Sequence, residues 1–463
     1  MQQPFKSIHF IGICGTAMGA VAAALKDSGF VVTGSDENVY PPMSTFLESK
    51  GVKLMSGFSP DNLSHKPDLI VVGNAVSRGN EEVEAVLEQK LYYLSLPETL
   101  KQFFLRGRHN LVVTGTHGKT TTTSLLAWIF EYAKKEPSFM IGGIPNNLPQ
   151  GCVIRPSPHF ILEGDEYDTA FFDKRSKFIH YMPELVIINN IEFDHADIFD
   201  SIDDILLSFS RLVRIVPRNG MIVVNADDIN AMSVVATSPA PLVTVGFSPN
   251  AAIRIEQVRY TGSSSSFVLG DLGHYELHML GEFNIRNAAM AIAAAHFYQI
   301  PLATIQEAVR FFKGVKRRQE VRGEVNGITV IDDFGHHPSA IKQTFIGLKH
   351  MYPGRRIWGI FEPRSNTTRR NIFQKELPDA FSEAYGVFIS QIHALQKLKE
   401  EDRLNPEKVI ADIQAKGIKA YYEPDADAIV SKLAPLTQKN DVIVIFSNGG
   451  FGNIHEKLLE AIK

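Results

Sequence analysis

Short apolar runs alternate with stretches of helical periodicity along most of the chain. Near the start, apolar runs at residues 7–11, 30–32 and 69–72 flank a stretch of small residues that predicts a helix over residues 17–26. Further apolar runs predict strands at residues 110–113, 160–162, 185–188, 221–224, 242–245, 328–331, 357–361 and 442–446. Strands that alternate with helical stretches are typical of α/β proteins. The pattern therefore predicts an α/β fold with mostly parallel sheets.

One segment breaks this pattern. Between residues 253 and 279, apolar and polar residues alternate around a serine tract at residues 263–266. Alternation with a period of two predicts antiparallel strands, and we expect the serine tract to form a loop between them. The chain has 463 residues, which at roughly 100–200 residues per domain suggests about three domains. We expect them at residues 1–107, 108–316 and 317–463.

Composition excludes several classes of partner. The net charge is −4, so the chain lacks the basic character expected of a protein that binds nucleic acid or an anionic membrane. The two cysteines, Cys14 and Cys152, cannot form a disulfide framework, which fits a reducing, cytoplasmic compartment. No uninterrupted run of about 18 apolar residues predicts a membrane span.

The most informative motif follows the strand predicted at residues 110–113. It reads G-T-H-G-K-T-T and consists of Gly115, Thr116, His117, Gly118, Lys119, Thr120 and Thr121. Glycines let backbone N–H groups approach a phosphate, a helix N-terminus attracts anions, and a Lys-Thr pair can contact terminal phosphates and Mg²⁺. The usual nucleotide loop has four residues between its glycines, and here there are two. A threonine-rich helix cap is the alternative, but a cap requires neither the paired glycines nor the lysine.

Two further groups follow predicted strands in the same region. Glu163 comes directly after residues 160–162, where a carboxylate beside a phosphate loop could hold Mg²⁺. The alternative is an acidic loop that faces water. His195 follows the strand at residues 185–188 and could ligate a second Mg²⁺ or contact the γ-phosphate, unless it is simply solvated.

The first predicted strand leads into a second glycine-rich turn. Gly12, Gly15 and Gly19 form G-x-x-G-x-x-x-G, which is not the dinucleotide fingerprint. A phosphate-binding turn and a tight helix–strand packing turn are equally consistent with it. Asp36, after the second strand, could hold a ribose hydroxyl or could be a solvated acid.

Several polar groups in the rest of the chain suggest ligand contacts. Asn284 and Asn287 are three residues apart at the start of an alanine-rich helix, so both amides face one side and could contact an adenine or ribose, although Asn284 could instead cap the helix. Arg317-Arg318 lies at a predicted boundary and is either a phosphate-binding hinge or a solvated linker. The segment at residues 171–178 has three cations and suits an anionic substrate or an ordinary surface loop.

The order of these motifs resembles that of the Mur ligase family of bacterial cell-wall synthesis. The resemblance rests on the turn at residues 115–121, the acids at 163–166, Asp194-His195, the asparagine pair, Arg318 and the D-D-F-G-H-H-P string at 332–338, and it covers essentially the whole chain. It implies a Rossmann-like UDP-sugar domain, a central ATPase domain and a Rossmann-like C-terminal domain.

The resemblance also implies an activity. The family members with the most similar strings use ATP and Mg²⁺ to join UDP-N-acetylmuramate to a recycled murein tripeptide, L-alanyl-γ-D-glutamyl-meso-diaminopimelate, through an acyl phosphate. Carried over to this chain, the implied catalytic residues are Lys119, Glu163, His195 and His336, and the metal ligands are Thr120, Glu163 and His195. The implied ATP contacts are residues 115–121 together with Asn284, Asn287, Arg318 and Asp333. The implied UDP-sugar contacts are Gly12, Gly15, Thr16, Ala17, Met18, Ser35, Asp36 and Asn74, and the implied peptide contacts are Lys174, Arg175, Arg364 and Asn448.

The chain departs from the family pattern at two points. Phe283 precedes Asn284 where the family often has a histidine. Sister ligases carry a carbamylated lysine about fifteen residues beyond the Asp-His pair, whereas residues 206–211 contain no lysine here. We therefore expect the metal coordination to be completed in another way, such as by water.

Four other functions compete with this hypothesis. A sister ligase would add L-alanine alone to the same UDP-sugar. A folate polyglutamate ligase is disfavoured by the N-terminal β-α-β pattern, and a nucleotide-binding oxidoreductase by the missing dinucleotide fingerprint. An ATP-gated binding protein would perform no chemistry. The sequence indicates neither the oligomeric state nor the third residue of the peptide.

Overall fold

The computed structural model describes residues 5–393, 395–396 and 398–463. The chain forms two compact units. The first comprises Met1–Gly142, Gln150–Ile191 and Asp203–Thr244, and the second comprises Gly143–Pro149, Glu192–Ile202 and Val245–Lys463. Each unit is described below by itself.

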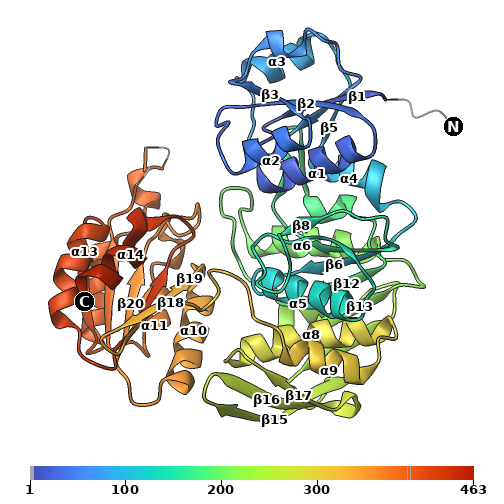
Figure 1. The fold of residues 1–463 in the computed structure, drawn as a ribbon. Helices are drawn as coiled ribbons and strands as arrows, with labels where there is room; N and C mark the ends of the chain where they lie inside the picture. The colour runs from blue at the N-terminus through green and yellow to red at the C-terminus, as the bar shows by residue number, and fades with distance from the viewer. Residues whose placement is uncertain (1–4, 394, 397) are drawn as a thin grey trace. The chain divides into compact units, whose positions relative to one another are not determined.

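A five-stranded parallel sheet begins the first unit (Figure 1). Its order is β3-β2-β1-β4-β5, with β1 (Ser7–Ile11), β2 (Val31–Asp36), β3 (Lys53–Ser56), β4 (Leu69–Val72) and β5 (Tyr93–Ser95). The accompanying helices are α1 (Thr16–Asp27), α2 (Met43–Ser49), α3 (Glu81–Glu88) and α4 (Leu96–Leu100), followed by the π-helical turn η2 (Lys101–Leu105). The strands predicted at residues 7–11 and 69–72 are confirmed, and β2 is longer than the predicted 30–32.

The extension of β2 has a clear physical cause. Thr33 and Ser35 are polar but buried, because their hydroxyls hydrogen-bond to His9 and Glu82 inside the fold. Polar residues beside a glycine normally indicate a turn. Here they continue the strand, and the pairing of Ile11 with Ser35 brings the end of β1 beside Ser35 and Asp36.

The first unit also contains a mostly parallel sheet built around β6. The order from β13 is β13-β12-β6-β9-β7-β8, and only β8 in this series runs antiparallel to its neighbour. The strands are β6 (His109–Thr114), β7 (Ser138–Met140), β8 (Cys152–Val153), β9 (His159–Glu163), β12 (Leu185–Ile188), β13 (Met221–Asn225) and β14 (Leu242–Gly246). The helices are α5 (Lys119–Tyr132), α6 (Ile202–Arg214) and α7 (Ile229–Val235), and β10 (Asp168–Ala170) and β11 (Asp173–Ser176) form a separate hairpin.

The second unit begins with the alternating segment. The last residues of β14 pair with β15 (Ile253–Thr261), which continues antiparallel into β16 (Ser264–Leu269) and β17 (His274–Leu277). The antiparallel prediction is confirmed. The serine tract was wrongly predicted as a loop, because Ser264, Ser265 and Ser266 pair within β16 and the Ser265 hydroxyl donates to the carbonyl of Met279. The helices α8 (Glu282–Phe297) and α9 (Leu302–Arg310) follow.

A six-stranded sheet completes the second unit in the order β18-β19-β23-β20-β21-β22. Its strands are β18 (Glu320–Val325), β19 (Ile328–Asp333), β20 (Ile357–Phe361), β21 (Gly386–Ser390), β22 (Lys419–Glu423) and β23 (Val442–Phe446). All pairs are parallel except β18 with β19. Because β23 lies between β19 and β20, the polar residues after these three strands meet at one edge of the sheet.

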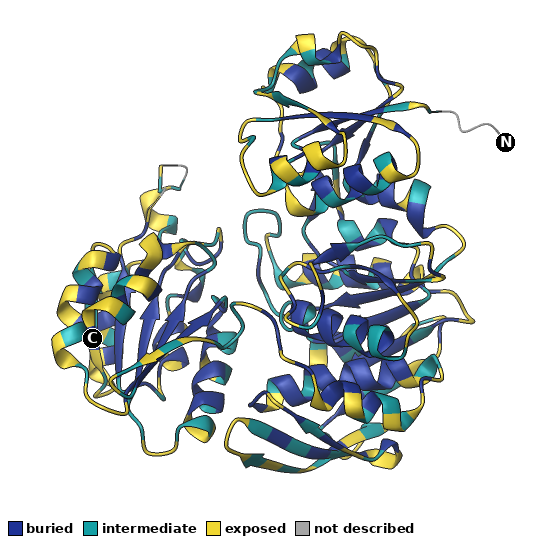
Figure 2. Ribbon diagram, viewed as in Figure 1, coloured by how far each residue is buried: buried dark blue, intermediate teal, exposed yellow. Residues whose placement is uncertain are grey.

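Helices cover both faces of this sheet. The side chains of α10 (Pro338–Met351), α11 (Leu377–Ala380) and α12 (Pro406–Ala415) pack on one face. Those of α13 (Ala426–Leu433) and α14 (Ile454–Ala461) pack on the other. The inner strands β19, β23, β20 and β21 are accordingly buried, while the edge strand β18 is largely exposed and the helices expose their outer faces (Figure 2). The predicted α/β class with mostly parallel sheets is confirmed.

The remaining helical elements are short 3₁₀ turns. They are η1 (Pro60–Leu63), η3 (Lys177–His180), η4 (Gly270–Leu272), η5 (Asn371–Phe373), η6 (Glu400–Asp402), η7 (Ala434–Leu436) and η8 (Phe451–Asn453). Among the described residues, no helix combines the length and apolar character needed to cross a membrane.

Candidate functional site

The turn between β6 and α5 has the backbone of a phosphate-binding loop. Gly115 has a φ of +127° and Gly118 a φ of +80°, both in the region that favours glycine. Gly118 is the N-cap of α5, and no side chain caps the helix there. The 14-residue helix therefore presents the positive end of its dipole to the turn.

Lys119 is held inside this turn by an ion pair. Its Nζ donates to the Glu166 carboxylate at 2.7 Å and to the Gly115 carbonyl at 2.7 Å. Burial alone would lower the pKa of Lys119, but the charges of Glu166 and Asp165 outweigh burial and raise it. The lysine is therefore charged at neutral pH, as contact with a phosphate requires. Glu166 is a functional candidate that the sequence argument missed, although it belongs to the same acidic turn as Glu163.

Thr120 and Glu163 lie together, as the metal prediction requires. The Thr120 hydroxyl donates to Glu163 Oε1 at 2.9 Å, and the backbone N–H of Gly142 donates to Oε2 at 2.7 Å. Glu163 is the last residue of β9 and not the first residue after it. A hydroxyl and a carboxylate offer only oxygen atoms, which suits a hard cation such as Mg²⁺.

Two asparagines after β12 shape the turn from the neighbouring strand. The Asn190 Oδ1 accepts the N–H of His117 at 2.7 Å, and the Asn190 carbonyl accepts that of Thr116 at 3.0 Å. Asn189 donates to the Thr122 hydroxyl at 3.1 Å. Their position directly after a buried strand was the available signal, but the sequence argument assigned them no role.

His336 and Asp194 approach each other in the second unit. His336 Nε2 lies 3.5 Å from Asp194 Oδ2, and Asp194 Oδ1 accepts the Thr367 hydroxyl at 2.7 Å. Burial would raise the pKa of Asp194, but hydrogen bonding and charge from His336, together with His195 and Thr367, lower it well below its usual range. The ionised carboxylate thereby orients His336. His195 has a φ of +55° and donates its own N–H to Asp194.

The residues of the second unit that were predicted to contact adenine or phosphate are either buried or packed against an aromatic ring. Asn284 and Asn287 are both buried, and Asn284 donates to the Leu280 carbonyl at 2.9 Å. Gly281 is the N-cap of α8, so the alternative in which Asn284 caps the helix is wrong. The guanidinium of Arg318 lies over the Phe334 ring, 4.9 Å from its centroid.

Asp333 organises the backbone around Arg318. It accepts the N–H groups of Gly335 at 2.6 Å and Gln319 at 3.2 Å. Its burial raises the pKa of the carboxyl, although the charge of Arg318 opposes this effect. Its predicted contact with ATP stays a prediction.

Arg317 also lies over the Phe334 ring, 5.4 Å from its centroid, but it makes further hydrogen bonds of its own. Its Nε donates to Asp332 at 3.1 Å, and an Nη donates to the carbonyls of Ser447 and Gly449 at 2.8 Å each. Arg317 thus holds the backbone of the turn after β23. The Oδ1 of Asn448, in that same turn, is buried and accepts no hydrogen bond.

The cations predicted to bind peptide already have acidic partners. Lys174 donates to Asp168 at 2.6 Å, and Arg175 forms two hydrogen bonds to Asp173 at 2.9 and 2.7 Å. The hydrogen bonds from Arg175 are the main reason why the pKa of Asp173 falls to about 2. Arg364 is half-exposed, 3.5 Å from Glu362. The predicted contact of Lys174, Arg175 and Arg364 with the peptide stays a prediction.

The N-terminal turn also has the features of an anion site. Gly12 has a φ of +83°, and Gly15 is the N-cap of α1 without a side-chain cap. Asp36 is partly exposed and accepts the N–H groups of Cys14 at 2.9 Å and Asn38 at 3.0 Å, so it supports the turn, and its predicted contact with the ligand stays a prediction. Thr16 and Asn74 are exposed, Ala17 is half-buried, and Met18 packs in the core.

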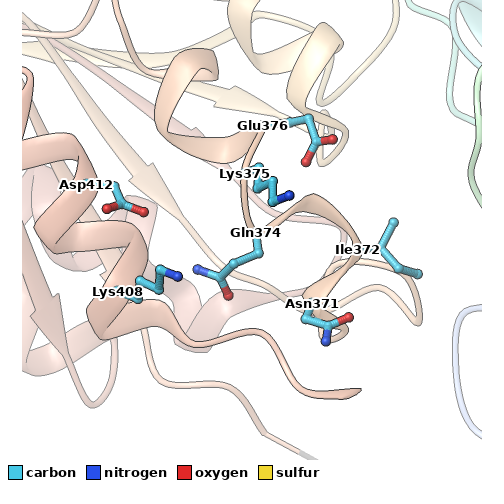
Figure 3. A pocket seen from close by; sticks show the side chains of 7 residues that line it. All are labelled: Asn371, Ile372, Gln374, Lys375, Glu376, Lys408 and Asp412. Atoms are coloured by element: carbon cyan, nitrogen blue, oxygen red, sulfur yellow. The ribbon is translucent and has the colours of Figure 1, made fainter. Parts of the chain in front are cut away.

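A pocket of about 500 Å³ lies elsewhere on the second unit (Figure 3). It is lined by Asn371, Ile372, Gln374, Lys375, Glu376, Lys408 and Asp412. None of the predicted site residues lines it. Gln374, one of its lining residues, donates to the Asn405 carbonyl at 3.1 Å and accepts the Asn405 N–H at 2.8 Å.

Comparisons with known proteins bear on the whole chain. Three family models match in succession: "Mur ligase family, catalytic domain" at residues 7–108, "Mur ligase middle domain" at 113–295 and "Mur ligase, glutamate ligase domain" at 317–449. The UDP-N-acetylmuramate–L-alanyl-γ-D-glutamyl-meso-2,6-diaminoheptandioate ligase of Escherichia coli is 42% identical over 98% of both chains. The UDP-N-acetylmuramate–L-alanine ligase of Acetivibrio thermocellus is 32% identical over 98% of this chain and 96% of its own.

A solved structure gives the same result. The crystal structure of a murein peptide ligase from Psychrobacter arcticus superposes with a TM-score of 0.71 at 37% identity, covering 99% of this chain and 98% of the other. The resemblance found in the sequence motifs is thereby confirmed. The chain belongs to the Mur ligase family.

Proposed function

We propose that this ligase joins the carboxylate of UDP-N-acetylmuramate to the amino group of L-alanyl-γ-D-glutamyl-meso-diaminopimelate at the expense of ATP. One observation carries the proposal. The β6–α5 turn, with Lys119 charged and Thr120 beside Glu163, lies in a chain that is 42% identical along its length to a ligase named for these substrates.

The first step is the transfer of a phosphoryl group. A carboxylate oxygen of the sugar attacks the γ-phosphorus of ATP, the bond from that phosphorus to the β–γ bridging oxygen breaks, and ADP leaves. Such transfers depend on positioning and charge neutralisation more than on covalent protein chemistry. The Lys119 ammonium turns from Glu166 to the phosphate oxygens, while the N–H groups at the start of α5 hold the remaining charge.

Thr120 and Glu163 would hold a Mg²⁺ ion, because their oxygen atoms lie 2.9 Å apart at the mouth of the turn. When bound, the ion supplies additional neutralisation of phosphate charge. His195 is proposed as a further ligand. Residues 206–211, which contain no lysine, lie within α6.

The second step forms the amide. The free amine of the tripeptide attacks the acyl carbon, the carbon–oxygen bond to phosphate breaks, and inorganic phosphate leaves with that oxygen. We assign acceptance of the amine proton to His336. The ionised Asp194 at 3.5 Å stabilises the imidazolium that results.

The runner-up function is the addition of L-alanine alone. It is supported by the relative of that name at 32% identity over 98% of this chain. A competition assay separates the two: the enzyme receives ATP, UDP-N-acetylmuramate and equimolar tripeptide and L-alanine, and mass spectrometry identifies the UDP-linked product. We expect the tripeptide adduct to dominate. Preferential formation of the L-alanine adduct would replace the proposal by the runner-up.

We further propose three functional domains at residues 1–107, 108–316 and 317–463, a division supported by the separate sheets at either end of the chain. A cytoplasmic location is supported by two cysteines that remain unpaired.

A further inference from the structure

The N-terminal sheet region contains a buried carboxylate, that of Glu82, in which both oxygen atoms accept hydrogen bonds. Glu82, on α3, is fully buried. Its Oε1 accepts from His9 Nε2 at 2.6 Å and from the Ser35 hydroxyl at 2.9 Å. Its Oε2 accepts from Asn62 at 2.8 Å and from the backbone N–H of Ser59 at 3.2 Å. A buried carboxylate is strongly unfavourable unless such donors surround it, so the four contacts act together.

The donors come from three different parts of the fold. His9 lies on β1, Ser35 on β2, and Ser59 and Asn62 lie at the start of and within η1, while Glu82 itself lies on α3. The other nitrogen of His9, Nδ1, is 2.7 Å from the Thr33 hydroxyl on β2. Glu82 therefore fixes the position of β2 relative to β1 and α3 through polar contacts.

Ser35 connects this buried group to the glycine turn. While its hydroxyl binds Glu82, its carbonyl accepts the N–H groups of Gly12 at 2.8 Å and Ile13 at 3.1 Å. The next residue, Asp36, accepts the N–H of Cys14 at 2.9 Å. The turn that leads into α1 is thus hydrogen-bonded to two consecutive residues of β2, Ser35 and Asp36. Ser35 is in turn held by its hydrogen bond to Glu82.

We propose that Glu82 is a positioning residue for UDP-N-acetylmuramate, acting through Ser35 on the turn at residues 12–16. The inference rests on the proposed function, in which that turn and the N-terminus of α1 bind the diphosphate of the UDP-sugar. It also changes the role of Ser35. The hydroxyl of Ser35 faces Glu82, so Ser35 supports the ligand site through its main chain and does not contact the ligand with its side chain.

The decisive variant is Glu82→Gln in the full-length enzyme. The amide has the same shape, but its NH₂ group meets two hydrogen-bond donors where a carboxylate oxygen accepted both. We expect the KM and the Kd for UDP-N-acetylmuramate to rise about tenfold, the effect of losing a hydrogen bond to a charged group. The KM values for ATP and tripeptide, and kcat, stay within about twofold of wild type because those contacts are carried by other elements.

Glu84→Gln is the matched control. Glu84 lies on the same helix but is paired with Arg78 at the surface, at 2.9 Å. We expect wild-type kinetics from it. Ser35→Ala is the second test variant, because it removes the hydrogen bond between Ser35 and Glu82 and leaves Glu82 with its other three donors. The main-chain bonds from Ser35 to the turn remain in this variant, and only the hydroxyl bond between Ser35 and Glu82 is lost. The variant should raise the KM for UDP-N-acetylmuramate in the same direction as Glu82→Gln, and it decides the question if Glu82→Gln does not yield folded protein.

The outcomes are distinct. Unchanged affinity for UDP-N-acetylmuramate in folded Glu82→Gln or in Ser35→Ala overturns the inference, as does a fall in kcat alone or an equal rise of all three KM values. These latter results would mean a general structural role. If the wild-type enzyme itself releases no ADP in response to UDP-N-acetylmuramate and an amine, the proposed function fails instead. Titration calorimetry with UDP-N-acetylmuramate alone then still reports whether Glu82 governs binding of the sugar nucleotide.

Discussion

Among single side chains, Lys119 is held by partners from its own turn and from the acidic turn after β9. Its side chain is 12% exposed, and its ammonium is bound by one carboxylate and by main-chain carbonyls of its own turn. The carboxylate of Glu166 keeps the cation charged and close to the place where a phosphate would bind. The sequence predicted Lys119 from its local motif, whereas it did not distinguish Glu166 from the other acids of the same turn.

Replacing Lys119 by alanine should lower kcat about 10²–10³-fold, by analogy with removing one preorganised donor from a charge-stabilising site. The measurement is ADP release with saturating substrates. Lys135→Ala, an exposed lysine just beyond the other end of α5, serves as the control and should behave as wild type. A Lys119→Ala enzyme that works within twofold of wild type would show that this turn is not the ATP site.

His159 should make the fold sensitive to mild acid. Burial, with the nearby His109, lowers the pKa of His159 from 6.5 to about 4. Between pH 6.5 and pH 4 the unfolded chain therefore binds a proton at this position that the folded chain does not bind. Stability contributed by His159 is complete above pH 6.5 and is lost as the pH falls towards 4.

The variant His159→Gln should accordingly lose fewer degrees of Tm than wild type between pH 7 and pH 4.5. Thermal melts at a series of pH values measure this difference, and comparing slopes removes the cost of the substitution itself. His274→Gln, at an exposed position on β17, is the control. Parallel Tm–pH curves for His159→Gln and wild type would refute the assignment.

Within the secondary-structure elements, the β6–α5 turn depends on a glycine at one position. A Cβ on Gly115 would come within 3.0 Å of the backbone of Asn190, and its φ of +127° is strained for any other residue. Gly115→Ala should therefore displace the turn and raise the KM for ATP about tenfold or more. Steady-state kinetics with varied ATP tests this expectation.

Gly107→Ala provides the comparison. Gly107 also has a positive φ, of +76°, but nothing lies within 4 Å of the position of its Cβ. We expect it to lower stability slightly and to leave the KM for ATP unchanged. A KM for ATP in Gly115→Ala as low as that in Gly107→Ala would contradict the expected role of Gly115.

Hydrophobic patterning predicted the buried parallel strands well, because a run such as Leu69–Val72 has no other stable place than a sheet covered on both faces. It missed β3 and β5, which are short and partly exposed, and also β21, whose five residues are all buried. It ended β2 too early and interpreted the serine tract as a loop. In both of these cases, buried hydroxyls find hydrogen-bond partners that are distant in the sequence.

For the chain as a whole, contacts between segments that are distant in the sequence could not be predicted. The family resemblance carried the order of motifs, but the pairing of Glu82 with His9 spans 73 residues and that of Asp194 with Thr367 spans 173. Neither residue pair has a local signature. The same limit explains why Arg317 and Arg318 looked equivalent in sequence. Both guanidinium groups lie over the Phe334 ring, but Arg317 also donates to the carbonyls of the turn after β23.

The central claim is that the carboxylate of the sugar is activated by the γ-phosphate of an ATP bound at Lys119. The most direct test uses UDP-N-acetylmuramate labelled with ¹⁸O in both carboxylate oxygens, with ATP and tripeptide. An acyl phosphate intermediate transfers one of these oxygens to phosphate when the amine displaces it. We predict one ¹⁸O atom in each inorganic phosphate released. Amide formation that leaves the phosphate unlabelled would contradict the account.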